Sequence, residues 1–132
     1  MNGKFTHTSD VERDQLPWGE LGWISRPAST GANELVVIEV SFSPGFGHNF
    51  HKHPDQEEVI YVIEGEVEQW LEQNKRVLKA GDSVFIPADI VHASFNVSDK
   101  PVKVLAILAP CVTADGYVSV EMSNQEPWKS LR

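Results

Sequence analysis

The stretch that decides the fold reads His51-Lys52-His53-Pro54-Asp55-Gln56-Glu57-Glu58, and a second stretch, Pro87-Ala88-Asp89-Ile90-Val91-His92, follows it further along the chain. Together the two stretches contain three of the five histidines in the protein. Imidazole nitrogens combined with a carboxylate oxygen are the ligands that a borderline divalent cation prefers. The pattern therefore predicts one metal site assembled from both stretches.

The spacing of these side chains limits the folds that can bring them together. Residues two apart in a strand share a face, so His51 and His53 are expected to point the same way. Glu58 opens the next predicted strand, and antiparallel pairing would bring it opposite the two histidines. His92 must come from a separate strand. The four side chains meet only if the sheet closes on itself or folds into two layers.

The distribution of turn residues in the rest of the chain is typical of an all-β protein. Eight prolines and nine glycines separate short apolar runs, and no segment keeps a helical period. This spacing of turns favours a barrel or a sandwich. The expected strands are 34–43, 58–64, 66–72, 83–86, 92–97, 102–109 and, more weakly, 117–121.

Length and charge narrow the function. A chain of 132 residues indicates one domain, 1–132, with a core barrel at approximately 34–110 and irregular arms at 1–17 and 122–132. A net charge of −8 argues against nucleic acid or an anionic membrane as a partner. The polar N-terminus has no signal-peptide core, and no apolar run reaches membrane-spanning length. We therefore expect a cytoplasmic protein.

The spacing of the candidate ligands resembles that of a known family. The first motif of the cupin superfamily is matched by Gly45, His51, His53, Glu58 and Gly65. Its second motif is matched by Gly81, Pro87, His92 and Asn96. Asp89 stands where the family usually has glycine, but this position is a turn, and aspartate tolerates unusual turn dihedrals.

This resemblance implies a small single-domain bacterial-type cupin, which is a double-stranded β-helix or jelly-roll barrel. It implies a divalent transition metal, Fe, Mn, Zn, Ni or Cu, bound by His51, His53, Glu58 and His92. Three neutral imidazoles and one carboxylate leave open positions on such an ion. The implied function is a metal-dependent enzyme acting on a small molecule, of dioxygenase, decarboxylase, lyase or isomerase type. The alternative is a non-catalytic module that binds a small molecule.

Further residues are candidates for the surroundings of the metal. Glu57 is the competing carboxylate, but it would face away from Glu58 on a regular strand. Gln56 shares the side of Glu58, and Ser94 shares the face of His92. His48 is expected in the loop 44–49, at the rim of a pocket.

The segment 66–72 raises two open questions. Its alternation places Val67, Gln69 and Leu71 toward the barrel, where the Gln69 amide is either hydrogen-bonded to a neighbouring strand or poised for a ligand. Trp70 falls on the solvent face among glutamates, and an exposed tryptophan usually has a packing partner. Either a homodimer contact, which is common in the family that the chain resembles, or cover from an arm explains it.

Overall fold

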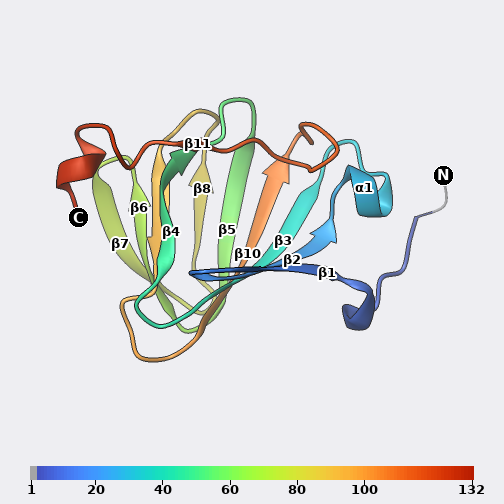
Figure 1. Ribbon diagram of the computed structural model, residues 1–132, viewed down its shortest axis with the longest axis horizontal. Helices are drawn as coiled ribbons and strands as arrows, with labels where there is room; N and C mark the ends of the chain where they lie inside the picture. Colours follow the sequence, from blue (N-terminus) through green and yellow to red (C-terminus); the bar gives the residue numbers. More distant parts are fainter. Residues whose placement is uncertain (1–2) are drawn as a thin grey trace.

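Two antiparallel sheets pack face to face in the computed structural model, which describes residues 3–132 (Figure 1). The six-stranded sheet has the order β1 (Glu12–Leu16), β2 (Gly19–Ser25), β3 (Val36–Phe42), β10 (Val102–Ala109), β5 (Glu57–Glu64) and β8 (Ser83–Ile86). The five-stranded sheet has the order β11 (Val120–Glu121), β4 (Gly47–Lys52), β9 (His92–Phe95), β6 (Glu66–Leu71) and β7 (Asn74–Lys79). Helical structure is limited to α1 (Pro27–Thr30) and the 3-10 turns Thr8–Asp10 and Trp128–Ser130. This confirms the predicted all-β, two-layer fold.

The inner faces of the two sheets form the core, because their strands alternate apolar and polar residues. In β3 and β10 every second residue is buried. The inward positions predicted from strand parity are also confirmed, since Ile60, Val62 and Val67 are at most 5% exposed. Tyr61 is 43% exposed and points outward, as parity predicts. The core is therefore a slab between the sheets, and any inward polar side chain lies inside it.

Several strands differ from expectation: β2 was not predicted, and of the expected strand 117–121 only Val120–Glu121 forms. The N-terminal arm is not irregular throughout, because 12–16 forms β1, which pairs only with β2 at the edge of the sheet. The strand β7 was not predicted, and its residues are mostly exposed, so no apolar alternation marks it. β4 begins at Gly47, so the expected loop 44–49 is shorter and His48 lies in a strand. The boundaries of the single domain, with its core at approximately 34–110, stay a prediction.

The C-terminal arm covers the outer face of the five-stranded sheet. Figure 1 shows the segment after β10 crossing one end of the barrel toward β7, with β11 on its way. Trp70 lies on the outer face, as parity predicts, but it is only 5% exposed because it is covered there. It packs edge-on against Phe50, and Trp128 and Leu131 from the arm complete this second cluster. The cover from an arm, one of the two expected explanations, is the one the structure shows.

No helix within residues 3–132 is long and apolar enough to span a membrane.

Replacing Trp70 by alanine tests the role of the arm. The Trp70→Ala variant should lose about 3–5 kcal/mol of unfolding free energy, because a buried ring is removed and a cavity remains. Urea denaturation followed by circular dichroism measures the loss. Val77→Ala is the control, since Val77 is 58% exposed on the neighbouring strand and its truncation should cost under about 0.5 kcal/mol. Equal losses in both variants would show that the arm does not bury Trp70.

Candidate metal centre

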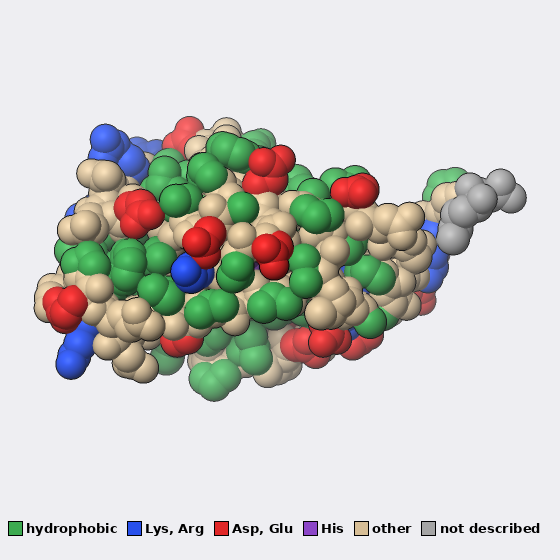
Figure 2. All heavy atoms as spheres, turned by 90° about the horizontal axis from the view of Figure 1, so that it is seen from above, with side chains coloured by type: hydrophobic (Ala, Val, Ile, Leu, Met, Phe, Trp, Pro, Cys, Tyr) green, Lys and Arg blue, Asp and Glu red, His purple; other side chains and the backbone are tan. Residues whose placement is uncertain are grey.

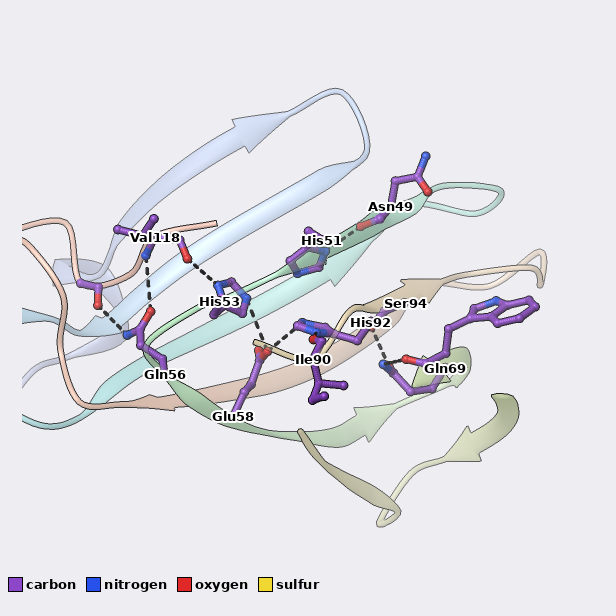
Figure 3. Close-up of polar contacts among 12 residues, drawn as sticks. Asn49, His51, His53, Gln56, Glu58, Gln69, Ile90, His92, Ser94 and Val118 are labelled. Carbon is purple, nitrogen blue, oxygen red and sulfur yellow. Dashed lines mark hydrogen bonds and ion pairs between the residues drawn. The ribbon is translucent and has the colours of Figure 1, made fainter. Parts of the chain in front are cut away.

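Three imidazoles meet inside the barrel, on the five-stranded sheet. His51 on β4 and His92 on β9 are directly paired across the two strands, and His53 follows the end of β4. One ring nitrogen from each of the three lies within 4.8 Å of the others. All three side chains are buried, with exposed fractions of 4%, 4% and 1% for His51, His53 and His92. The structure thus brings together the three histidines that the sequence singled out (Figure 3).

Each imidazole is oriented by a backbone carbonyl. The Nδ1 atom of His51 lies 2.6 Å from the carbonyl oxygen of Asn49, and the same atom of His92 lies 2.9 Å from that of Ile90. The Nδ1 atom of His53 lies 2.9 Å from the carbonyl oxygen of Val118. A carbonyl accepts only, so each Nδ1 carries the proton and donates it. In the neutral rings the Nε2 lone pairs are therefore free to bind a cation.

Glu58 completes the group from the opposite sheet. The expected pairing of its strand with the histidine strand is wrong, because β5 pairs with β10 and β8. Glu58 instead reaches across the barrel, where its Oε1 atom lies 3.0 Å from Nε2 of His92 and 3.5 Å from Nε2 of His53. Its side chain is buried, whereas Glu57 is exposed. Strand parity thus chose the inward carboxylate correctly, although it could not show from which sheet that carboxylate comes.

These atoms fit a divalent cation. Oε1 of Glu58 and Nε2 of His92 are both buried, and neither has a hydrogen-bond partner of acceptable geometry despite their close approach. A carboxylate oxygen facing an imidazole lone pair at this distance is repulsive unless positive charge is shared between them. A proton or a metal ion supplies that charge. The neighbouring Nε2 atoms of His51 and His53 favour the metal ion, because they add two further donors of the right type.

Burial sets the charge state of the histidines. It lowers the pKa of His51 well below its usual value, with the nearby His48 adding to the effect. Burial also lowers the pKa of His53, and it lowers the pKa of His48 to about 4. Burial raises the pKa of Glu58, but the adjacent His92 and His53 outweigh it, and the net pKa is lowered. Burial also opposes the charged form of His92, but the Glu58 carboxylate outweighs it and raises the pKa of His92. The site therefore holds neutral His51 and His53 beside an ionised carboxylate, and a metal ion would take the place of the proton that His92 and Glu58 share without it.

A cavity adjoins the candidate ligands. It encloses about 40 Å³, room for only a few water molecules, and Tyr117 and His48 contribute to its wall. Apolar side chains of the six-stranded sheet make up most of the rest, namely Leu21, Ile38, Val40, Phe42, Ile60, Val104, Ala106 and Leu108. None of the described residues lining this cavity is lysine or arginine. In Figure 2 no histidine is visible on the face seen from above, in keeping with the burial of the site.

Of two residues in the cavity wall, the sequence indicated His48 but gave no sign of Tyr117. His48 was expected at the rim of a pocket, and it lines the cavity with its ring stacked 3.7 Å from that of His51. Tyr117 was not singled out, yet its ring lies 5.3 Å from that of His53. Burial raises the pKa of Tyr117, so its hydroxyl keeps the proton. No motif surrounds Tyr117, so only the three-dimensional path of the C-terminal segment reveals it.

Gln56 secures the segment that carries Tyr117. Its amide Nε2 donates to the carbonyl oxygens of Pro110 (2.7 Å) and Gly116 (3.0 Å). Its Oε1 accepts from the backbone N–H of Val118 (3.3 Å), the residue whose carbonyl orients His53. The side chain is 2% exposed. The Gln56 side chain thus acts on His53 through the backbone of 110–118, and its own backbone N–H donates to the carbonyl oxygen of His53 (3.4 Å).

The remaining candidates form a polar pair in the barrel wall. The Ser94 hydroxyl donates to Oε1 of Gln69 at 2.6 Å, and Nε2 of Gln69 donates to the carbonyl oxygen of Trp70 at 3.1 Å. Both side chains are 3% exposed. Of the two roles expected for Gln69, the structure shows the hydrogen bond to a neighbouring strand.

The second stretch of sequence supports the site through a turn. Asp89 adopts a positive φ of 66°, the conformation for which the usual glycine is suited. Its backbone N–H donates to the carbonyl oxygen of His53 at 2.9 Å, and its carboxylate lies 2.9 Å from Nζ of Lys52. These contacts explain how aspartate holds the turn.

Comparison with known proteins identifies relatives in sequence and in fold. The pectin degradation protein KdgF of Dickeya dadantii is 32% identical over 90 residues, which cover 67% of this chain and 82% of that protein. The polyketide synthase CurC of Streptomyces cyaneus is 28% identical over 123 residues, which cover 92% and 80%. The structure of KdgF from Halomonas sp. has a TM-score of 0.74 at 22% identity, covering 85% of this chain and 97% of that one.

Two further comparisons concern the fold and the family. The structure of oxalate decarboxylase from Bacillus subtilis has a TM-score of 0.73 at 20% identity, covering 88% of this chain but 31% of that one. At this identity the likeness shows the fold alone. The model of the cupin domain family matches residues 38–108, which is more than half of the chain. Together with the two motifs and the two-sheet barrel, this match shows that the chain belongs to the cupin family.

Proposed function

We propose that this cupin is a metal-dependent enzyme that acts on a small molecule at His51, His53, Glu58 and His92. One observation carries the proposal: backbone carbonyls hold three imidazoles with their Nε2 atoms converging, and a buried carboxylate oxygen faces them without a hydrogen-bond partner. A divalent transition metal, Fe, Mn, Zn, Ni or Cu, would supply Lewis acidity or an oxygen-binding centre there. A substrate would reach the metal through the adjoining cavity, whose walls would have to move apart to admit it.

The chemistry of the cavity wall indicates the class of substrate. Its lining is apolar apart from the candidate ligands and a few polar groups such as Tyr117 and Ser94. A molecule with several negative charges would find no lysine or arginine among the described lining residues. A small, largely apolar molecule that carries an oxygen donor, such as a phenol or an enolisable ketone, fits this wall.

The protein's own groups would bind and orient that molecule. The Tyr117 hydroxyl keeps its proton and offers a hydrogen bond to a substrate oxygen, while the apolar wall excludes water from the reacting end. The relatives described as a polyketide synthase and a pectin degradation protein support action on small organic molecules. The reaction type, whether dioxygenase, decarboxylase, lyase or isomerase, stays open. Location in the cytoplasm stays a prediction.

Metal content tests the ligand assignment. Elemental analysis of the purified protein should find about one divalent transition metal ion per chain, and the His92→Ala variant should lose most of it. Glu57→Ala is the matched control, because it removes the adjacent but exposed carboxylate and should keep the metal. A wild-type protein without stoichiometric metal, or a His92→Ala variant that carries as much, would contradict the assignment.

Filling the cavity separates catalysis from metal binding. The Ala106→Leu variant places extra bulk in the wall, so it should retain the metal but lose at least about tenfold in turnover. Turnover is assayed with protein loaded with each of the five metals, against small phenols and enolisable ketones. The control is Ala109→Leu on the same strand, where strand parity turns the side chain to the outer face.

The outcomes separate the two candidate functions. Turnover by the wild type and the control, and its loss in Ala106→Leu, would support the enzyme. Ligand binding without turnover by any metal form would instead favour the non-catalytic binding module.

The outer face of the six-stranded sheet supports a homodimer. Tyr61, Ile63 and Phe85 are 43%, 43% and 53% exposed on this face. Val59 lies beside Phe85 on one strand and beside Ile107 on the other, which makes the apolar row continuous. A second copy related by a two-fold axis would present the same row, because such an interface is self-complementary.

A charge on this face tests the dimer. The Phe85→Lys variant should elute from size exclusion at about half of the apparent mass of the wild type, because a buried unpaired charge disfavours association. Val77→Lys is the control, since Val77 is comparably exposed but lies on the other sheet. A wild type that already elutes as a monomer, or a Phe85→Lys variant that elutes with the wild type, would count against this interface.

A further inference from the structure

A second cavity opens on the other side of the barrel, where the two sheets part. The strands β7 and β8 are joined by a short turn, but they belong to different sheets and are not hydrogen-bonded to each other. Between them lies a cavity of about 350 Å³ that is open to solvent on one side. This falls in the range of cavities that hold small molecules. Its lining shares no residue with the cavity beside the candidate metal ligands.

The walls of this second cavity are amphipathic. Leu71, Leu78 and Val84 supply aliphatic surface from β6, β7 and β8. The Gln69 amide, which is 3% exposed, lies at the inner end. Arg76 lies directly opposite Gln69 across the two strands, so strand parity directs its side chain to the same face. The cavity therefore combines an apolar wall with one guanidinium group.

Arg76 has no acidic partner within residues 3–132. No carboxylate of residues 3–132 forms an ion pair with Arg76, and within these residues its only side-chain hydrogen bond goes to the carbonyl oxygen of Lys75 (2.9 Å). In a protein with a net charge of −8, a guanidinium without a carboxylate partner is conspicuous. The planar guanidinium of arginine can donate two parallel N–H hydrogen bonds to one carboxylate.

We propose that this second cavity binds a small amphipathic carboxylate, with the carboxylate on Arg76 and the apolar body against Leu71, Leu78 and Val84. The Gln69–Ser94 hydrogen bond separates the two cavities, because Gln69 lines the second and Ser94 lines the first. Leu71 lies opposite His92 in the strand register. A ligand here therefore sits behind the wall of the metal centre without contacting the candidate ligands. This site goes beyond the proposed function and does not depend on the metal.

The probe is 4-phenylbutyrate, titrated into the full-length protein and followed by methyl NMR. The methyl signals of Leu71, Leu78 and Val84 should shift, and those of Leu21, Ile38 and Leu108 in the first cavity should not. The neutral analogue 4-phenylbutan-1-ol should bind at least about tenfold more weakly, because it lacks the charge that Arg76 recognises.

Two variants on one strand complete the test. Arg76→Gln should weaken 4-phenylbutyrate binding at least about tenfold, because it removes the guanidinium but keeps an exposed polar side chain. Lys75→Gln is the matched control. Lys75 lies on the opposite face of β7, over the ring of Trp70, and its loss should change the affinity by less than about twofold.

Three outcomes would overturn the proposal. One is no binding up to about 10 mM 4-phenylbutyrate, which is weaker than a built site should bind. The second is a set of shifts confined to the first cavity, which would place the carboxylate at the metal centre. The third is equal affinity in Arg76→Gln and the wild type.

Discussion

The structure depends on one buried carboxylate held against imidazoles from the opposite sheet. Glu58 belongs to the six-stranded sheet and His92 to the five-stranded sheet, yet their side-chain atoms approach to 3.0 Å in the core. Burying such a charge is costly unless compensating charge lies close by. The histidines reach the Glu58 carboxylate only when the two sheets are packed in the correct alignment. The packing of the two layers and the arrangement of the buried polar groups therefore depend on each other.

The C-terminal segment extends this constraint to the rest of the chain. After β10 it passes the barrel end, where the Gln56 side chain holds its backbone and the carbonyl oxygen of Val118 accepts a hydrogen bond from Nδ1 of His53. It then pairs briefly with β4 and ends against Trp70 on the outer face. One segment thus orients a candidate ligand, lines the cavity through Tyr117 and covers an apolar surface. This segment makes few strand-pairing hydrogen bonds. It is held in place because each part of it contacts a different part of the barrel, namely Gln56, His53, β4 and Trp70.

Two cavities flank the same polar wall, and their chemistry differs. The first is apolar around the candidate metal ligands, whereas the second carries the guanidinium of Arg76 at an open seam between the sheets. The Ser94–Gln69 hydrogen bond lies between them. A fold built from two sheets leaves a gap at each side, and the side chains at each gap decide what it accepts.

The sequence by itself determined the all-β class, the inward parity of Ile60 and Val62, and the choice of Glu58 over Glu57. It did so because strand alternation and ligand spacing are local properties. It did not reveal β7, whose exposed residues carry no pattern. It put Trp70 on the outer face but left open whether a second copy or an arm covers it, because the arm is distant in sequence. Only the tertiary structure decided that Glu58 comes from the opposite sheet, that backbone carbonyls fix the imidazoles, and that Tyr117 and Arg76 line separate cavities. Those relations join residues far apart in the chain, and strand pairing across the two sheets sets them.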